Sequence, residues 1–229
     1  GPAGGFRTAP MGPRDVPMKP SSGVSTFFDL MLHAPTVCNA QKRLQGQADA
    51  PLTPAGEALA RCWGLVLRGQ PYRRILSSDL GRALATAAVL NTVLGLPLST
   101  DPRLREQDWG RWTGETLAAL RARDPARLAA AEDRGWDFRP PGGESRREVW
   151  RRGCAALLAA ARRWPGETLL VVTHEGVIKC LAYGLSARGF LPDEAPLLRP
   201  RHLHRLCAAG GHLTTTALNR LALDPQPFL

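Results

Sequence analysis

One uninterrupted apolar run constrains the fold of this chain more than any other feature of its sequence. Residues 168–173 read Thr-Leu-Leu-Val-Val-Thr, with large aliphatic side chains and no polar residue between the two threonines. A strand with one solvated face alternates apolar and polar residues, whereas a strand covered on both faces is apolar throughout. The run therefore predicts a central strand of a parallel sheet, with helices against both of its faces.

Strand-like and helix-like segments alternate along the rest of the chain. The other predicted strands span residues 25–32, 74–78, 203–207 and 213–218, and the last two form a hairpin. The predicted helices span residues 53–68, 79–94, 114–123, 125–134, 144–164 and 175–185. Thr53 and Pro54 suit the start of the first helix, and Ser78 or Asp79 is expected to cap the second. The predicted fold is α/β, a three-layer sandwich with a mostly parallel central sheet flanked by helices.

The chain has 229 residues, which suits one large domain. Residues 24–229 are expected to form that domain. Residues 1–23 are rich in Gly and Pro without periodicity, which predicts a disordered N-terminal arm. No stretch approaches the ~20 apolar residues of a membrane span, so we expect no membrane partner.

The charge balance is +10, and arginine supplies nearly all of the basic residues. A nucleic-acid-binding protein would cluster such arginines on one face. The alternative is that Arg replaces Lys generally and that some arginines hold an anionic substrate. Because no run of five basic residues and no nucleic-acid-binding motif occurs, we expect no nucleic-acid partner.

The five cysteines are odd in number and lack metal-ligand spacing. They predict reduced thiols in a cytoplasmic protein. His202, His204 and His212 invite a metal interpretation, but no carboxylate or cysteine stands beside them at ligand spacing. We therefore expect hydrogen-bonding histidines there, and neither a metal nor a cofactor.

Two other histidines come directly after predicted strands. His33 follows the strand at 25–32, which Pro35 prevents from continuing, and His174 follows the apolar strand at 168–173. Ligands of open parallel sheets bind outside the carboxyl ends of the strands. The sequence therefore predicts two imidazoles in one crevice, although each could also be a hydrogen-bonded polar residue of the core.

Five blocks of the sequence resemble, in order, the motifs of the histidine phosphatase superfamily, which has the phosphoglycerate mutase-like fold. The blocks are Leu32-His33-Ala34-Pro35-Thr36-Val37-Cys38-Asn39, Arg43-Leu44-Gln45-Gly46 with Asp49-Ala50-Pro51-Leu52-Thr53, Ser78-Asp79-Leu80-Gly81-Arg82-Ala83, Leu104-Arg105-Glu106 with Gly110-Arg111-Trp112-Thr113-Gly114, and Val172-Thr173-His174-Glu175-Gly176-Val177-Ile178. The resemblance covers roughly residues 26–220 and implies this fold for the chain.

The resemblance also implies catalytic roles that agree with the physics of phosphoryl transfer. His33 would attack phosphorus and carry a phosphoryl group, which splits one displacement into two. Arg82 and His174 would stabilise the charge on the transferring group. Glu106 would protonate the leaving group and then activate water. Less specific alternatives are a surface position for Arg82 and an ion pair of Glu106 with Arg103 or Arg105.

The resemblance further places five residues in contact with substrate: Asn39, Arg43, Gln45, Gly46 and Glu175. Asn39 could instead be a turn residue. The expected partner is a small-molecule phosphate ester, and a homodimer is left open.

The sequence departs from the family pattern at Leu32, where the family has an arginine that clamps the same phosphoryl oxygens as Arg82. Losing such a clamp would reduce phosphoryl transfer by roughly 10²–10⁴-fold. Glu175 is a second departure, because a carboxylate at this helix start would repel a phosphate unless it points away.

These departures leave several functions open. The favoured one is hydrolysis of a small phosphorylated metabolite, with Arg43, Arg105 or another arginine in place of the lost clamp. The alternatives are a site adapted to different chemistry, a weakly active or purely ligand-binding protein, and a mutase. The segment 135–143, with Trp136 and Phe138, is expected to cover the mouth of the site. The segment 190–205 is either a second covering loop or an oligomer contact.

Overall fold

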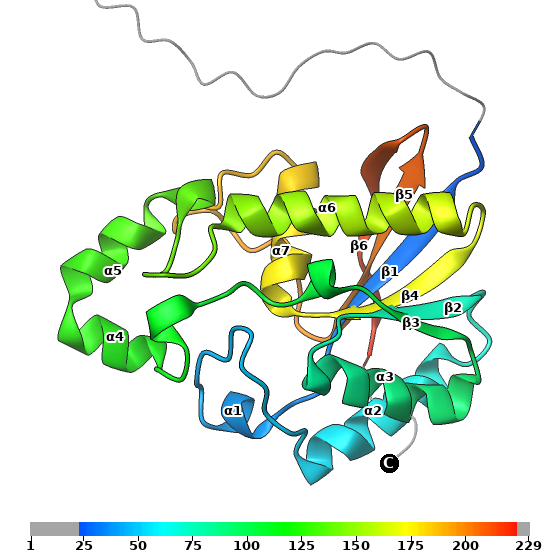
Figure 1. Ribbon diagram of the computed structural model, residues 1–229, viewed down its shortest axis with the longest axis horizontal. Coiled ribbons are helices and arrows are strands. Elements are labelled where there is room, and N and C mark those ends of the chain that lie inside the picture. The colour runs from blue at the N-terminus through cyan, green and yellow to red at the C-terminus, as the bar shows by residue number, and fades with distance from the viewer. Residues whose placement is uncertain (1–22, 224–229) are drawn as a thin grey trace, which may run out of the picture.

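The computed structural model describes residues 23–223, and it places the expected strands in one mixed sheet (Figure 1). The predicted arm therefore lies outside the described residues except for Gly23. The strands are β1 Thr26–Leu32, β2 Arg74–Ser77, β3 Leu98–Thr100, β4 Thr168–Thr173, β5 His202–Ala209 and β6 His212–Ala222. The helices are α1 Val37–Ala40, α2 Pro54–Leu67, α3 Gly81–Leu94, α4 Leu117–Arg123, α5 Pro125–Glu132, α6 Arg146–Arg163 and α7 Glu175–Leu185. Short 3-10 turns occur at Pro102–Leu104, Gly110–Trp112 and Gly135–Asp137.

The strand order is β3-β2-β4-β1-β5-β6. The first four strands are parallel, and β5 and β6 continue the sheet in antiparallel pairing. The mostly parallel sheet is thus confirmed, and the predicted hairpin forms its antiparallel edge. The short strand β3 was not predicted, because its three residues are half-exposed and carry no apolar pattern.

The central strand β4 buries both of its faces, as its unbroken apolar run predicts. Leu169 and Val171 pack with α6 and α7, whereas Leu170 and Val172 pack with α2 and α3. Figure 1 shows these two helix pairs on opposite faces of the sheet. All four side chains have no exposed surface, and burial of each contributes about 1.5–3 kcal/mol. The three-layer sandwich is therefore the observed architecture.

The helix starts were predicted with mixed success. Thr53 caps α2, accepting a hydrogen bond from the Gly56 N–H at 2.9 Å, as expected. The prediction for α3 was wrong, because Leu80 occupies its N-cap position and provides no side-chain acceptor. The Asp49 carboxylate instead accepts from the N–H groups of Gly81 (2.7 Å) and Arg82 (3.3 Å). A residue from a distant loop therefore replaces the local cap.

A buried carboxylate joins the parallel and antiparallel parts of the sheet. Asp29 of β1 has no exposed surface, and both of its oxygens accept from Arg205 of β5 at 2.7 Å. The Tyr72 hydroxyl donates to it at 2.6 Å, and Arg220 of β6 donates at 3.2 Å. Two cations and a phenol thus offset the cost of burying this charge.

The strand register places the candidate catalytic residues. Leu32 of β1 pairs with Thr173 of β4, and the His33 N–H donates to the Thr173 carbonyl at 3.0 Å. His33 and His174 therefore leave neighbouring strands at the same edge. Within residues 23–223, none of the helices combines the length and apolarity that crossing a bilayer requires.

Candidate active site

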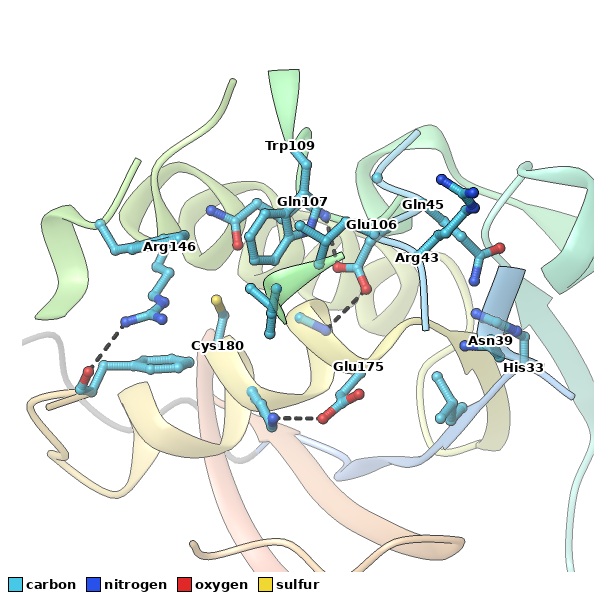
Figure 2. A pocket seen from close by; sticks show the side chains of 18 of the residues that line it. His33, Asn39, Arg43, Gln45, Glu106, Gln107, Trp109, Arg146, Glu175 and Cys180 are labelled. Atoms are coloured by element: carbon cyan, nitrogen blue, oxygen red, sulfur yellow. Dashed lines mark hydrogen bonds and ion pairs between the residues drawn. The ribbon is translucent and has the colours of Figure 1, made fainter. Parts of the chain in front are cut away.

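A cavity of about 350 Å³ opens at the carboxyl edge of the parallel strands. Its volume lies in the range of small-molecule sites. His33, Arg82 and Glu106 line it, as do all five residues predicted to contact substrate. Figure 2 shows the cavity with His33 and Arg146 on opposite sides.

The hydrogen bonds of His33 fix its tautomer. Its Nδ1 lies 2.8 Å from the Ala34 carbonyl oxygen, which can only accept, so Nδ1 carries the proton. Its Nε2 lies 3.1 Å from Nε of Arg82, which can only donate, so Nε2 holds the lone pair. Burial lowers the pKa of His33 to about 4. His33 is therefore a neutral imidazole with a defined nucleophilic nitrogen.

Arg82 is a buried cation rather than a surface charge, with 1% of its surface exposed. Its Nη2 donates to the Gly46 carbonyl at 2.7 Å, and its Nη1 donates to the Ala48 carbonyl at 2.9 Å. The loop before α2 thus holds the guanidinium from one side, and its Nε faces His33. Gly46 has φ +53°, and a Cβ there would lie 3.1 Å from the Trp109 nitrogen, so the tight approach favours glycine.

His174 lies beside His33, with the two ring centroids 5.2 Å apart. Its Nε2 is 2.8 Å from the Ser78 hydroxyl, and it has no exposed surface. Among the described residues its Nδ1 has no hydrogen-bond partner. Burial, and then the neighbouring His33, hold the pKa of His174 well below its usual value. Both imidazoles are therefore neutral. They lie side by side as predicted, but of the two only His33 lines the cavity, because His174 is buried behind it.

Glu106 sits at the start of α7, where two backbone N–H groups hold its carboxyl group. Gln107 donates to Oε1 at 2.7 Å, and Gly176 donates to Oε2 at 3.2 Å. Burial raises the pKa of Glu106 despite these bonds. The alternative ion pairs of Glu106 with Arg103 and Arg105 do not form. Arg103 pairs with Asp101 instead, and Arg105 pairs with Asp79. The raised pKa favours a carboxyl group that can give up a proton to a substrate.

The residues predicted to contact substrate are partly committed to other bonds. Asn39 closes a capping box at α1, where its Oδ1 accepts from the Thr36 N–H at 2.9 Å. Gln45 places its Oε1 3.0 Å from the Thr36 hydroxyl. Arg43 donates to the Gly114 carbonyl at 2.7 Å. The carboxamide nitrogens of Asn39 and Gln45 carry no hydrogen bond to a described residue, so they are the groups that can turn to a ligand.

The expected repulsion from Glu175 is offset by a residue that sequence reasoning missed. Lys179 lies one helical turn later and approaches a Glu175 oxygen to 2.5 Å, as the dashed line in Figure 2 shows. Both side chains line the cavity. The i, i+4 spacing of opposite charges on a predicted helix was a readable signal for this pair.

Leu32 lines the cavity and packs against the core beneath α6 and α7. Arg105, one of the arginines expected to replace the missing clamp, faces elsewhere: it forms two hydrogen bonds with Asp79, at 2.7 and 2.5 Å. Arg105 was therefore a wrong candidate, whereas Arg43 does line the cavity. The pairing of Arg105 spans 26 residues, which local spacing does not reveal.

The end of the cavity away from His33 is aromatic and holds a second, half-buried arginine. This end is lined by Phe138, from the segment predicted to cover the site, and by Phe190, from the segment left open as a second covering loop. Trp136 does not line the cavity and packs against Trp150. Arg146 stacks between the two phenylalanine rings, with its guanidinium carbon 4.3 Å from each centroid. Sequence reasoning missed Arg146, because nothing in an arginine-rich segment indicates which arginine lines a cavity.

Two of the three tail histidines make the expected hydrogen bonds, whereas the side chain of the exposed His212 makes none with the described residues. His202 Nδ1 lies 2.7 Å from the Pro200 carbonyl, and His204 Nδ1 accepts from the Asn219 N–H at 3.1 Å. Among residues 23–223, no group of three or more His, Cys, Asp or Glu side chains has the arrangement of a metal site.

Comparison with known proteins agrees with this geometry. The sequence profile of the histidine phosphatase superfamily (branch 1) matches residues 29–219. A probable phosphoglycerate mutase GpmB of Yersinia enterocolitica is 36% identical over 152 residues, which covers 66% of this chain and 71% of that protein. Among solved structures, Bacillus stearothermophilus YhfR matches with a TM-score of 0.77 and 29% identity, covering 86% of this chain and 98% of that one.

A second solved structure is the mycobacterial glucosyl-3-phosphoglycerate phosphatase in complex with VO3. It matches with a TM-score of 0.70 and 30% identity, covering 86% of this chain and 98% of that chain. Members of the matched family are phosphatases or mutases. With the profile matching most of its length, the chain belongs to the histidine phosphatase superfamily.

Proposed function

We propose that the protein is a phosphomonoester hydrolase that acts on a small phosphorylated metabolite through a phosphohistidine at His33. The observation that carries this proposal is the fixed tautomer of His33. Its Nδ1 proton is held by the Ala34 carbonyl, and its Nε2 lone pair lies at the cavity beside Arg82. Attack on phosphorus needs a neutral imidazole in this tautomer.

In the first step, Nε2 of His33 forms a bond to phosphorus while the bond from phosphorus to the ester oxygen breaks. Arg82 donates its Nε–H to His33 Nε2 in this structure. A phosphoryl oxygen carries negative charge and is a stronger acceptor than an imidazole nitrogen. Binding of the substrate would therefore draw Arg82 onto the phosphoryl group and free the lone pair for attack.

Glu106 supplies the proton that the departing alkoxide needs. Because burial raises the pKa of Glu106, its carboxyl group stays protonated at pH values above the ordinary pKa of a glutamate. In the second step the resulting carboxylate takes a proton from water, and the hydroxide formed attacks phosphorus. The bond from phosphorus to Nε2 breaks, which releases orthophosphate and restores neutral His33 and protonated Glu106.

A second candidate function rests on Leu32. With leucine beside His33, one cation fewer faces the transferring group than the family motif provides. That change favours either a weakly active enzyme or a site adapted to a different reaction or to ligand binding alone. The resemblance to a protein named as a probable phosphoglycerate mutase keeps phosphoryl transfer between two substrate positions as a further alternative.

The test is a rapid-quench experiment with a 32P-labelled phosphate ester. The hydrolase proposal expects a phosphoenzyme that is stable in base, labile in acid and absent from His33→Ala, together with release of orthophosphate. A folded His33→Ala variant with wild-type turnover would refute the nucleophile. Label that moves to an acceptor hydroxyl rather than to water would favour a mutase, and substrate binding without any labelled enzyme would favour the ligand-binding alternative.

A further inference from the structure

The guanidinium group of Arg146 is held rigidly at the aromatic end of the cavity. It lies over the rings of Phe138 and Phe190, and its Nη1 donates to the carbonyls of Gly135 and Phe190 at 3.1 Å each. Only its in-plane edge formed by Nε and Nη2 is left. Among the described residues this edge makes no hydrogen bond and no ion pair.

Other arginines of this protein show what such an edge binds. In each of them Nε and Nη2 together contact the two oxygens of one carboxylate. The pairs are Arg74 with Glu167, Arg103 with Asp101, Arg105 with Asp79, Arg147 with Asp137, Arg152 with Glu144 and Arg205 with Asp29. The planar fork matches the geometry of a carboxylate. Arg146 therefore presents the same donor pair without the carboxylate that these six arginines have.

Solvent can reach the free edge. Arg146 lines the cavity and also an adjoining hollow, and its Nε and Nη2 are not among the fully buried atoms that lack a partner. In Figure 2 the hydrogen bond of its guanidinium group points away from Cys180 and Glu106. Glu132 also lines the cavity, but no carboxylate oxygen of the described residues lies within the 4 Å ion-pair distance of Arg146. Arg146 is half-buried, and this partial desolvation lowers its pKa. An anion that reached this edge would satisfy both its hydrogen bonds and its charge.

We infer that Arg146 is a specificity-determining residue, whose Nε and Nη2 edge binds a carboxylate on the leaving group of the phosphate ester. This inference rests on the proposed function, which places the phosphoryl group at the opposite side of the cavity, beside His33. The substrate class is then a phosphomonoester with a carboxylate. The aromatic side chains that line the cavity favour an apolar or planar body for the leaving group.

The test uses two substrates of equal shape, 4-carboxyphenyl phosphate and 4-carbamoylphenyl phosphate. Both offer the same ring and phosphate, but only the first carries a second anion. The wild-type protein should prefer the carboxylate in kcat/KM. Replacing Arg146→Gln should reduce that preference by about 10- to 100-fold, the range expected for losing hydrogen bonds to a charged group.

Two further variants serve as controls. Arg147→Gln removes an exposed arginine of the same helical turn that binds Asp137, and it should leave the preference unchanged. Arg146→Lys keeps a cation but removes the planar fork, so it should lose the preference at least severalfold. If Arg146→Gln fails to fold, the lysine variant decides alone, and a full wild-type preference in it would overturn the inference.

The outcomes separate this inference from the proposed function. Hydrolysis of both esters with a preference that Arg146→Gln does not change overturns the role of Arg146 and leaves the hydrolase intact. If the wild-type protein hydrolyses neither ester, the proposed function fails. Calorimetry with 4-carboxybenzylphosphonate and 4-carbamoylbenzylphosphonate then tests Arg146 directly. Equal affinities for these two analogues in the wild-type protein would overturn the inference.

Discussion

Gly176 allows the carboxyl group of Glu106 to lie against the start of α7, and adding one methyl group there tests the role of that carboxyl group. A Cβ at position 176 would lie 2.3 Å from Oε1 and 3.2 Å from Cδ of Glu106. The clash meets the end of a side chain rather than backbone, so the fold can absorb it if Glu106 moves. Alanine also favours a helix over glycine by up to about 1 kcal/mol. We therefore expect Gly176→Ala to fold with near-normal stability.

The cost of this substitution should appear in proton transfer. To reach ordinary contact the carboxyl group must retreat by about 1 Å, and a misplacement of this size costs on the order of 10²-fold in rate. For an alkyl phosphate, whose leaving alkoxide needs the proton, kcat/KM should fall about 100-fold. For p-nitrophenyl phosphate, whose leaving group needs little protonation, the loss should be only severalfold.

The assay is the pair of kcat/KM values for each protein, because kcat/KM reports steps only up to the first irreversible one. Gly153→Ala is the matched control: it adds a methyl group to α6, where the nearest neighbour would be Leu181 Cδ2 at 3.3 Å. That variant should change both substrates alike. Equal losses on both esters in Gly176→Ala, or none on either, would refute the placement of Glu106 as the proton donor.

Three other perturbations follow from the same structure. With one ester measured across pH, kcat/KM should decline as the pH drops below about 4, where His33 becomes protonated. It should also decline as the pH rises past the raised pKa of Glu106, where the proton donor is lost. Glu106→Gln should remove this second decline. Leu32→Arg should raise kcat/KM about 10- to 100-fold if hydrolysis is native, and a decrease in a folded variant would favour a different reaction. Asp29→Ala leaves Arg205 without its buried carboxylate, so the free energy of unfolding in urea should fall by about 3–5 kcal/mol; a change under 1 kcal/mol would contradict the network.

The parts of this site that the sequence predicted correctly are those set by the sheet. An unbroken apolar strand predicts a position in the middle of a parallel sheet, and neighbouring parallel strands end at the same edge. A histidine that directly follows such a strand therefore lies at that edge. The sequence thus predicts that His33 and His174 lie side by side, and the 5.2 Å between their ring centroids agrees with that prediction. Local chemistry also sufficed for Thr53 and Pro54, since an N-cap depends only on the next few residues.

The parts that could not be predicted depend on contacts between distant segments. Asp49 caps α3 from a loop 32 residues before Gly81, so no local pattern marks it. Arg105 and Arg146 look alike in an arginine-rich sequence, yet one binds Asp79 and the other is stacked between aromatic rings. Which of the two arginines lines the cavity depends on the packing of the covering segments. That packing follows from tertiary structure and not from spacing.

Leu32 and Arg146 together suggest how binding energy is distributed in this cavity. A cation beside the transferring phosphoryl group would bind substrate phosphate, transition state and product orthophosphate alike, at least in part. A cation at the opposite side of the cavity binds only esters that carry the second anion, and its binding energy can position the phosphoryl group at His33. With leucine at position 32, the protein should hold free orthophosphate weakly while retaining affinity for a two-anion substrate. Leu32→Arg should therefore strengthen product inhibition by orthophosphate along with any gain in rate. An unchanged inhibition constant in a folded Leu32→Arg variant would mean that position 32 does not face the phosphoryl group.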